Sequence, residues 1–313
     1  MLSSIVEDSQ KSWFSYEPFT LRALYDYFQN QFITAYSNLE YIVDCYRNTT
    51  GREIYPLSKE YLYYHPEVAE QNIALLKNAI ELWKAATKTT DAIAPILYHY
   101  SWHCFNSFFA YSFFRWEPEH SKSHGIYISK WNDDVSEIQI GILNDGLFKR
   151  VLDAWTCLGA SLAFSAYLPK IEGDKISFQK NELFFLQDSN VFKISRLLSF
   201  NSTEDFERNY WRTYGREKLL RNSSFTTWGN GPTRILKDYL VLFVASSIAR
   251  YRPILWSSTL LGETKNQADF TLATRAALLG YTQFGLNSTS FLHQLHLLIN
   301  DLMKGKFELK GLS

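Results

Sequence analysis

The chain has few cysteines, and none stands in a pattern that metal or redox chemistry uses. Cys45, Cys104 and Cys157 are far apart, and no CxxC pair occurs. An odd number of isolated cysteines argues against a disulfide scaffold and favours a reducing compartment, so we expect a cytoplasmic protein. We interpret the three thiols as small buried hydrophobic groups.

The sequence also lacks an excess of charge of either sign. Its 32 basic and 32 acidic side chains cancel over 313 residues. A neutral chain has no global field that would attract nucleic acid or an anionic membrane, so either kind of binding needs a local basic patch. The 14 glycines and 8 prolines are too few for a low-complexity chain, and no period repeats, whereas 46% hydrophobic residues can form a large core.

We expect neither a secretory signal nor a membrane-spanning helix. The first residues, MLSSIVEDSQK, carry two acids and no apolar stretch. Residues 92–114 are free of charge and long enough to span a bilayer. However, His99, His103 and Asn106 lie in this segment, and unsatisfied polar groups are costly in hydrocarbon. The segment therefore predicts a helix buried inside the protein.

Apolar residues recur at helical spacing along most of the chain. We expect helices over residues 21–47, from Pro66 to the Thr-rich break at residue 87, and from Pro95 to a point before Pro118. Three successive helices with short breaks predict an antiparallel bundle. Further helices are expected over residues 148–166, 203–220, 232–251, 267–279 and 288–303.

The middle of the chain changes to a period of two. Ile126, Ile128, Ile138, Ile140 and Ile142 alternate with other residues in the way that half-buried strands do, and short strands are also expected over 171–179 and 181–187. The predicted fold is mainly α, a helical bundle with a small β insertion in the middle of the chain. No linker divides the sequence, so we expect one domain over residues 1–313. The alternative is a helical half over 1–120 and a half with a small sheet and helices over 121–313.

Sequence motifs for phosphate loops and zinc proteases are absent. His99 and His103 stand four residues apart, and His293 and His296 three apart, spacings that can present two imidazoles to a metal. Neither pair has a local third ligand. We therefore expect no bound metal and no cofactor, and we interpret His99 and His103 as core residues.

An arginine followed closely by a histidine is the pattern of the helical HEPN ribonucleases. Arg115 and His120, in RWEPEH, have a spacing of this kind. Chance alone supplies about one such match in a chain of this composition. Pro118 also falls inside the motif, and Trp116 stands where that class usually has a polar residue. Arg115 and His120 are therefore candidate catalytic residues that depart from the pattern.

The segment SSIARYRPILW, residues 246–256, places two guanidinium groups around Tyr251 where Pro253 breaks a helix. Such a cluster can bind a phosphate or carboxylate with two hydrogen bonds. Arg250, Arg252 and Trp256 are therefore candidate binding residues. The alternative is structural: the arginines pair with acids of the fold and the tryptophan packs in the core.

A second basic region, residues 208–221, interleaves arginines with aromatic residues. This mixture suits stacking on bases and contacts to phosphates, which makes Arg208, Arg212 and Arg216 a candidate nucleic-acid interface. Acidic neighbours dilute the charge, so the alternative is a solvated helix with salt bridges.

The order of several blocks resembles the YaaC-like family of uncharacterised bacterial proteins over most of the chain. The aromatic helix followed by His-Gly is more weakly similar to HEPN-like helical domains. The family has no established activity, but the resemblance favours His124 over His120 as an active histidine. The blocks are Trp13-Phe14, PILYHYSWHCFNSFFAYSFF from Pro95, SHGI from Ser123, NDGLFKRVLDAW from Asn144, and SSIARYRPILW.

Together these observations predict a bacterial binding or assembly component of a phage-defence or nucleic-acid-handling system, acting with a protein partner or as a homo-oligomer. The alternative is a HEPN-like ribonuclease or RNA-binding protein. An enzyme needs His124 or His120 to meet Arg115 or Arg250 in an open cleft, whereas an assembly component needs a large exposed aromatic patch. We also expect His124, Arg250 and Arg252 to lie close together, because each stands at a sharp break of the chain.

Overall fold

The fold is mainly helical, with a small three-stranded sheet formed by the middle of the chain, as the sequence predicts. The computed structural model describes residues 36–56, 66–115, 123–157, 166–172, 175–181, 190–199 and 230–280. Within these ranges the helices are α3 (Tyr36–Thr50), α5 (Pro66–Thr87), α6 (Ala94–Phe113), α7 (Leu147–Cys157), α8 (Ile194–Ser199), α11 (Asn230–Tyr251), α12 (Pro253–Leu261) and α13 (Lys265–Gly280).

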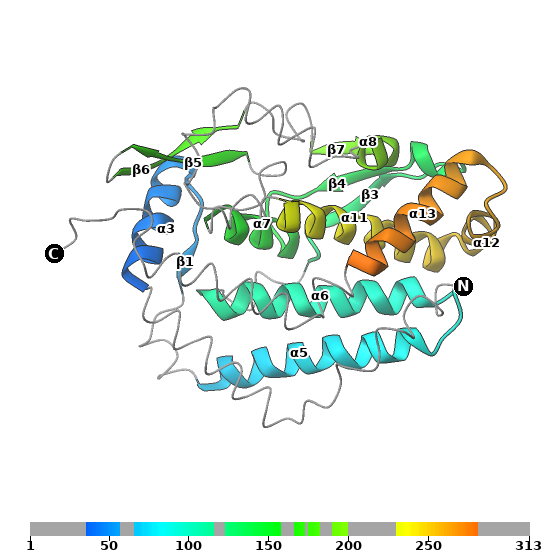
Figure 1. The fold of residues 1–313 in the computed structure, drawn as a ribbon, viewed down its shortest axis with the longest axis horizontal. Helices are drawn as coiled ribbons and strands as arrows, with labels where there is room; N and C mark the ends of the chain where they lie inside the picture. The colour runs from blue at the N-terminus through cyan, green and yellow to red at the C-terminus, as the bar shows by residue number, and fades with distance from the viewer. Residues whose placement is uncertain are drawn as a thin grey trace.

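Helix α6 lies between α5 and α11 (Figure 1). Its first turn contains Pro95, whose missing N–H has no intrahelical partner to lose at that position. Tyr98, Trp102 and Phe109 are at most 1% exposed. The charge-free segment is therefore a buried helix, as predicted. No helix in the described part of the chain is long and apolar enough to cross a membrane.

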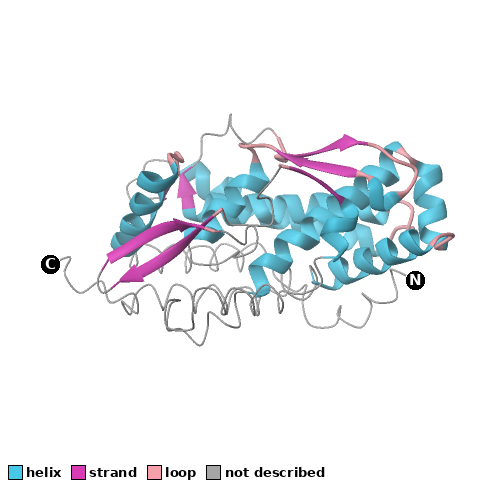
Figure 2. Cartoon of the chain, turned by 90° about the horizontal axis from the view of Figure 1, so that it is seen from above, coloured by secondary structure: helices cyan, strands magenta, loops and turns pink. Residues whose placement is uncertain are grey.

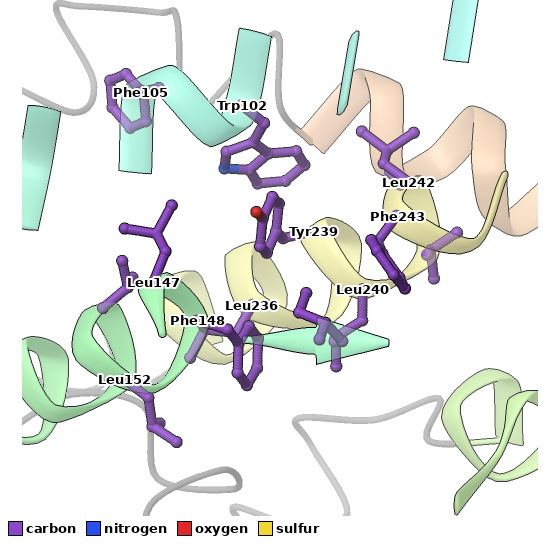
Figure 3. Close-up of a cluster of buried hydrophobic side chains, with 14 of the residues drawn as sticks. Trp102, Phe105, Leu147, Phe148, Leu152, Leu236, Tyr239, Leu240, Leu242 and Phe243 are labelled. Atoms are coloured by element: carbon purple, nitrogen blue, oxygen red, sulfur yellow. The ribbon is translucent and has the colours of Figure 1, made fainter. Parts of the chain in front are cut away.

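The core between these helices is aromatic (Figure 3). Trp102 of α6 faces Tyr239 of α11, with ring centroids 6.1 Å apart. Phe148 of α7 stacks on the same tyrosine at 6.3 Å, with the ring planes only 9° apart. Burying a large apolar side chain stabilises a fold by about 1.5–3 kcal/mol, and a favourable ring pair adds about 1 kcal/mol. Tyr239 thus joins α6, α7 and α11.

The sheet confirms the predicted change of period. Its antiparallel strands are β3 (Ile126–Lys130), β4 (Gln139–Ile142) and β7 (Val191–Lys193), in the order β3-β4-β7. A hairpin of β5 (Tyr167–Glu172) and β6 (Lys175–Lys180) lies apart from this sheet (Figure 2), and β1 (Tyr55–Pro56) pairs with β2 (Phe114–Arg115). Between β3 and β4, a 3-10 helix, η3 (Val135–Glu137), packs on α13.

Residues 123–125 cap the first turn of α7. The N–H groups of Leu147 and Phe148 donate to the carbonyls of Ser123 and His124, each at 3.1 Å. These are donors that a helix cannot satisfy internally. The approach is close because Gly125 and Gly146 meet there, with φ of 72° and 110°. This contact fixes the backbone of His124 against α7.

Pro253 ends one helix and begins another. The sequence predicts the break, but it does not predict α12, and the structure corrects this. Arg252, with φ −139° and ψ 58°, separates α11 from α12, and Pro253 occupies the first turn of α12. Proline cannot continue a helix but is favoured at its first position, so one residue has both effects.

Several expected elements lie outside the described residues. These are the helices over 203–220 and 288–303, most of the strand over 181–187, the first part of the helix over 21–47, and Trp13 and Phe14.

We predict that Gly146→Ala destabilises the protein by about 3–5 kcal/mol, from a strained backbone and an overpacked contact. An added Cβ would lie 2.5 Å from Gly125 Cα, which is backbone and cannot swing away. Gly51→Ala is the matched control, because Gly51 also has positive φ but its Cβ would meet nothing within 4 Å. The control should cost only about 1–2 kcal/mol in urea unfolding. Equal losses in the two variants would contradict the close contact.

Candidate functional site

Three histidines from two parts of the sequence meet beside α11. His99 and His103 lie one turn apart on α6, and His124 comes from the segment that caps α7. The ring centroid of His124 is 4.4 Å from that of His103 and 5.2 Å from that of His99. The sequence analysis names all three residues but misses their meeting, because the contact depends on the capping of α7.

His99 is the buried floor of this cluster. It is 0% exposed and stacks on Tyr239 at 5.3 Å, with the edge of Phe243 at 5.5 Å. Neither of its ring nitrogens has a hydrogen-bond partner in the described part of the chain. Burial, with the nearby His124, His103 and Arg250, holds the pKa of His99 well below its ordinary value. The ring is therefore neutral and packs as an aromatic group.

His103 and His124 form a hydrogen-bonded chain with Tyr239. His103 Nδ1 lies 3.1 Å from Tyr239 Oη and 3.0 Å from His124 Nδ1. Burial raises the pKa of Tyr239, so its hydroxyl keeps its proton. Burial, and then the neighbouring His124, lowers the pKa of His103 to about 3, so that ring is neutral.

Two proton arrangements satisfy these contacts. Either His103 Nδ1 accepts from both Tyr239 and His124 Nδ1, or His103 Nδ1 carries the proton and shares it between these two partners, so that His124 carries its own proton on Nε2. In each arrangement one nitrogen of His103 serves two partners.

Arg250, in the last turn of α11, brings the positive charge. Its Nη1 donates to Tyr100 Oη at 2.9 Å, and its guanidinium lies 4.9 Å from the ring centroid of Tyr251. Its Nε is buried without a hydrogen-bond partner, and no carboxylate among the described residues pairs with it. Burial, and then the charge of Arg250, lowers the pKa of His124. The site therefore combines one guanidinium with neutral imidazoles.

The structure brings together two of the three residues that we expected to converge. His124 and Arg250 both contact Tyr100. The ring centroid of His124 lies 5.9 Å from that of Tyr100, and Arg250 donates to the Tyr100 hydroxyl. Arg252 has different contacts: it lies over Trp131 and pairs with Asp133 at 2.9 Å.

The remaining predicted residues do not contribute to this cluster within the described structure. Trp256 is buried and donates from Nε1 to the carbonyl of Asp91 at 3.1 Å, a contact that belongs to the structural alternative. Arg115 pairs in β2 with Tyr55 of β1. The other candidates, His120, Arg208, Arg212 and Arg216, lie outside the described residues, as do His293 and His296.

A second buried polar cluster is structural. Asp153 of α7 accepts hydrogen bonds from Tyr46 at 2.8 Å, Arg52 at 2.9 Å and Lys149 at 2.7 Å. Its carboxylate is fully used, so it holds α3 against α7 and offers nothing to a ligand. Within the described ranges, no group of three or more His, Cys, Asp or Glu side chains is placed to hold a metal ion.

We predict that acidification destabilises the protein through His103. The pKa of this histidine is about 3 in the folded chain but near 6.5 when unfolded, so the unfolded state binds more protons between these values. The free energy of unfolding is therefore highest above pH 6.5 and decreases as the pH falls towards 3. From pH 6.5 to 4.5 the loss is about 2 kcal/mol.

His103→Asn is the test, because its amide can still bond to Tyr239 but does not titrate. Urea unfolding across this pH range should show a shallower fall for the variant than for the parent chain. Parallel curves would show that His103 is not held neutral.

Comparison with known proteins places this chain in no family. No family model, no curated protein and no solved structure matches it. The resemblance to the YaaC-like family, and the weaker one to HEPN-like domains, stay predictions from the sequence. The function therefore has to be argued from the site itself.

Proposed function

We propose that the protein is a YaaC-like binding component of a nucleic-acid-handling system, and that Arg250 binds a phosphate of a single strand. The observation that carries this proposal is a half-buried guanidinium with no carboxylate partner among the described residues. Such a charge is costly unless something anionic compensates it. A phosphate matches the geometry of a guanidinium and can take two hydrogen bonds from it.

Aromatic rings beside Arg250 suit the bases of the same ligand. Tyr251 is 64% exposed and lies next to Trp131, with ring centroids 6.4 Å apart. Proteins that bind single strands combine such rings, on which bases stack, with basic groups that contact the backbone. This patch of Tyr100, Trp131, Arg250 and Tyr251 supplies both parts in a chain without net charge.

The partners of Arg250 and Arg252 differ, although both arginines belong to the segment 246–256. Asp133 is paired with Arg252, and both groups are exposed, so that pair is already neutral. Arg250 has only the phenol of Tyr100 and the ring faces around it. We therefore assign the phosphate contact to Arg250 and not to Arg252.

A cytoplasmic location, a phage-defence setting and a protein partner or homo-oligomer complete the proposal. They rest on the absence of a disulfide pattern and on the resemblance to the YaaC-like family. Exposed apolar side chains on α12 and α13, namely Ile254, Leu261 and Leu272, add support for a partner.

A HEPN-like ribonuclease is the second candidate. The observation that favours it is that His124 and Arg250 share Tyr100, so that a neutral imidazole and a guanidinium lie near one ligand position. This pair would replace Arg115 and His120 in the catalytic role. Incubation of labelled RNA with the protein in EDTA distinguishes the candidates, because only a ribonuclease shortens the strand.

We predict that Arg250→Gln weakens binding of a fluorescent single-stranded oligoribonucleotide about ten- to a hundredfold, the loss expected for a charge-assisted hydrogen bond. The slope of log K against log salt should become shallower by about 0.7, since one phosphate contact is gone. Fluorescence anisotropy at several salt concentrations measures both quantities, and the melting temperature checks the fold.

Arg252→Gln is the matched control, two residues along the same segment. It should weaken binding much less than Arg250→Gln does, because its charge is already paired with Asp133. Equal weakening by the two variants, or no effect of Arg250→Gln, would show that the phosphate contact lies elsewhere.

A further inference from the structure

His124 contacts both the hydrogen-bonded chain and the tyrosine that Arg250 uses. Its Nδ1 lies 3.0 Å from His103 Nδ1. Its ring centroid lies 5.9 Å from that of Tyr100, and the hydroxyl of Tyr100 accepts a hydrogen bond from Arg250. The side chain is half-buried, and after burial the charge of Arg250 is the cause that lowers its pKa. The protonation of His124 therefore depends on whether the charge of Arg250 is compensated.

The coupling between Arg250 and His124 acts in both directions. While the guanidinium has no anion beside it, its charge repels a proton from His124, and the ring is neutral at neutral pH. An anion bound to Arg250 cancels this repulsion and itself attracts the proton, so the pKa of His124 rises. By thermodynamic linkage, an anion that favours the protonated ring binds more tightly as the pH falls.

The neighbouring titratable groups of the described structure leave this coupling intact. Those of α6 and α11 that belong to the cluster are His99, Tyr100, His103 and Tyr239. Both of these histidines have pKa values far below the ordinary one, and a tyrosine keeps its proton at neutral pH. On the side of α7, Asp145 lies against Gly125, and its carboxylate pairs with Arg150. Arg250 is therefore the charge to which His124 responds.

We infer that His124 takes up a proton when an anion binds to Arg250, so that the site holds its ligand more tightly in mildly acidic solution than at higher pH. This inference rests on the proposed function. A protonated ring has an N–H on both nitrogens, whichever of them held the single proton before. Its Nδ1 then donates to His103, whose neutral ring can accept. The second positive charge of the site lies beside Tyr100, which Arg250 also contacts.

A labelled oligouridylate with hydroxyl ends tests this inference, because neither its phosphodiesters nor its bases titrate where histidines do. At constant ionic strength, its affinity should rise about three- to fivefold as the pH falls from 8 to 5.5. This gain is part of the roughly tenfold per pH unit that the uptake of one whole proton gives. Fluorescence anisotropy measures the affinity, and a melting curve at each pH checks the fold.

Calorimetry counts the protons directly. Binding is measured near pH 6 in two buffers that differ in their enthalpy of ionisation. The difference between the two binding enthalpies should show that each chain takes up a fraction of one proton with the oligouridylate. Binding without proton uptake would overturn the inference.

Two amide variants within the cluster identify the histidine that is protonated. His124→Asn does not titrate, but its amide can still bond to His103, so it should lose both the gain at acidic pH and the proton uptake. His103→Asn is the matched control. It removes an imidazole that is neutral over the whole interval, so it should keep both effects. A gain that persists in His124→Asn would belong to other histidines of the chain and would also overturn the inference.

The inference and the proposed function fail in different ways. If the oligouridylate binds and Arg250→Gln weakens it, but the affinity of the parent chain does not change with pH, the phosphate contact stands and only the role of His124 is wrong. If the strand does not bind, or Arg250→Gln has no effect, the proposed function itself is wrong and takes the inference with it.

Discussion

The packing of α6 against α11 is the contact on which both the core and the candidate site depend. Tyr239 makes this plain, because its ring packs between Trp102 and Phe148 while its hydroxyl bonds to His103. The same side chain is therefore a core residue at its ring and part of the site at its oxygen. A substitution that loosens the two helices would also displace the histidines.

The site is arranged at a cost in stability. His99 buries two ring nitrogens that have no hydrogen bond within the described structure, which costs about 1–3 kcal/mol. Three imidazoles next to a guanidinium remain tolerable only because burial keeps them uncharged. A core with phenylalanine in place of His99 would avoid this cost. Ionisable groups with strongly shifted pKa values are concentrated at functional sites, although structural networks also contain them.

The sequence predicts individual elements well where one local signal decides. Pro66 and Pro95 mark the starts of α5 and α6, and the alternation around Ile140 marks the sheet. It fails where two signals compete, as at Pro253, which ends α11 but also opens α12. It also fails for the convergence of His99, His103 and His124, because that convergence depends on two glycine backbones meeting at Gly125 and Gly146. Two histidines in a charge-free helix are the one local signal that could have revealed it.

The separation of Arg250 from Arg252 shows how the backbone gives similar residues different roles. Both guanidinium groups lie over aromatic rings, Arg250 over Tyr251 and Arg252 over Trp131, so composition cannot distinguish them. Arg250 still belongs to the last helical turn and projects towards Tyr100 of α6. Arg252 has left helical geometry because Pro253 follows it, and its side chain reaches Asp133, between β3 and η3. A single proline thus directs one positive charge to a neutralising partner and leaves the other beside the histidines, where a ligand can compensate it.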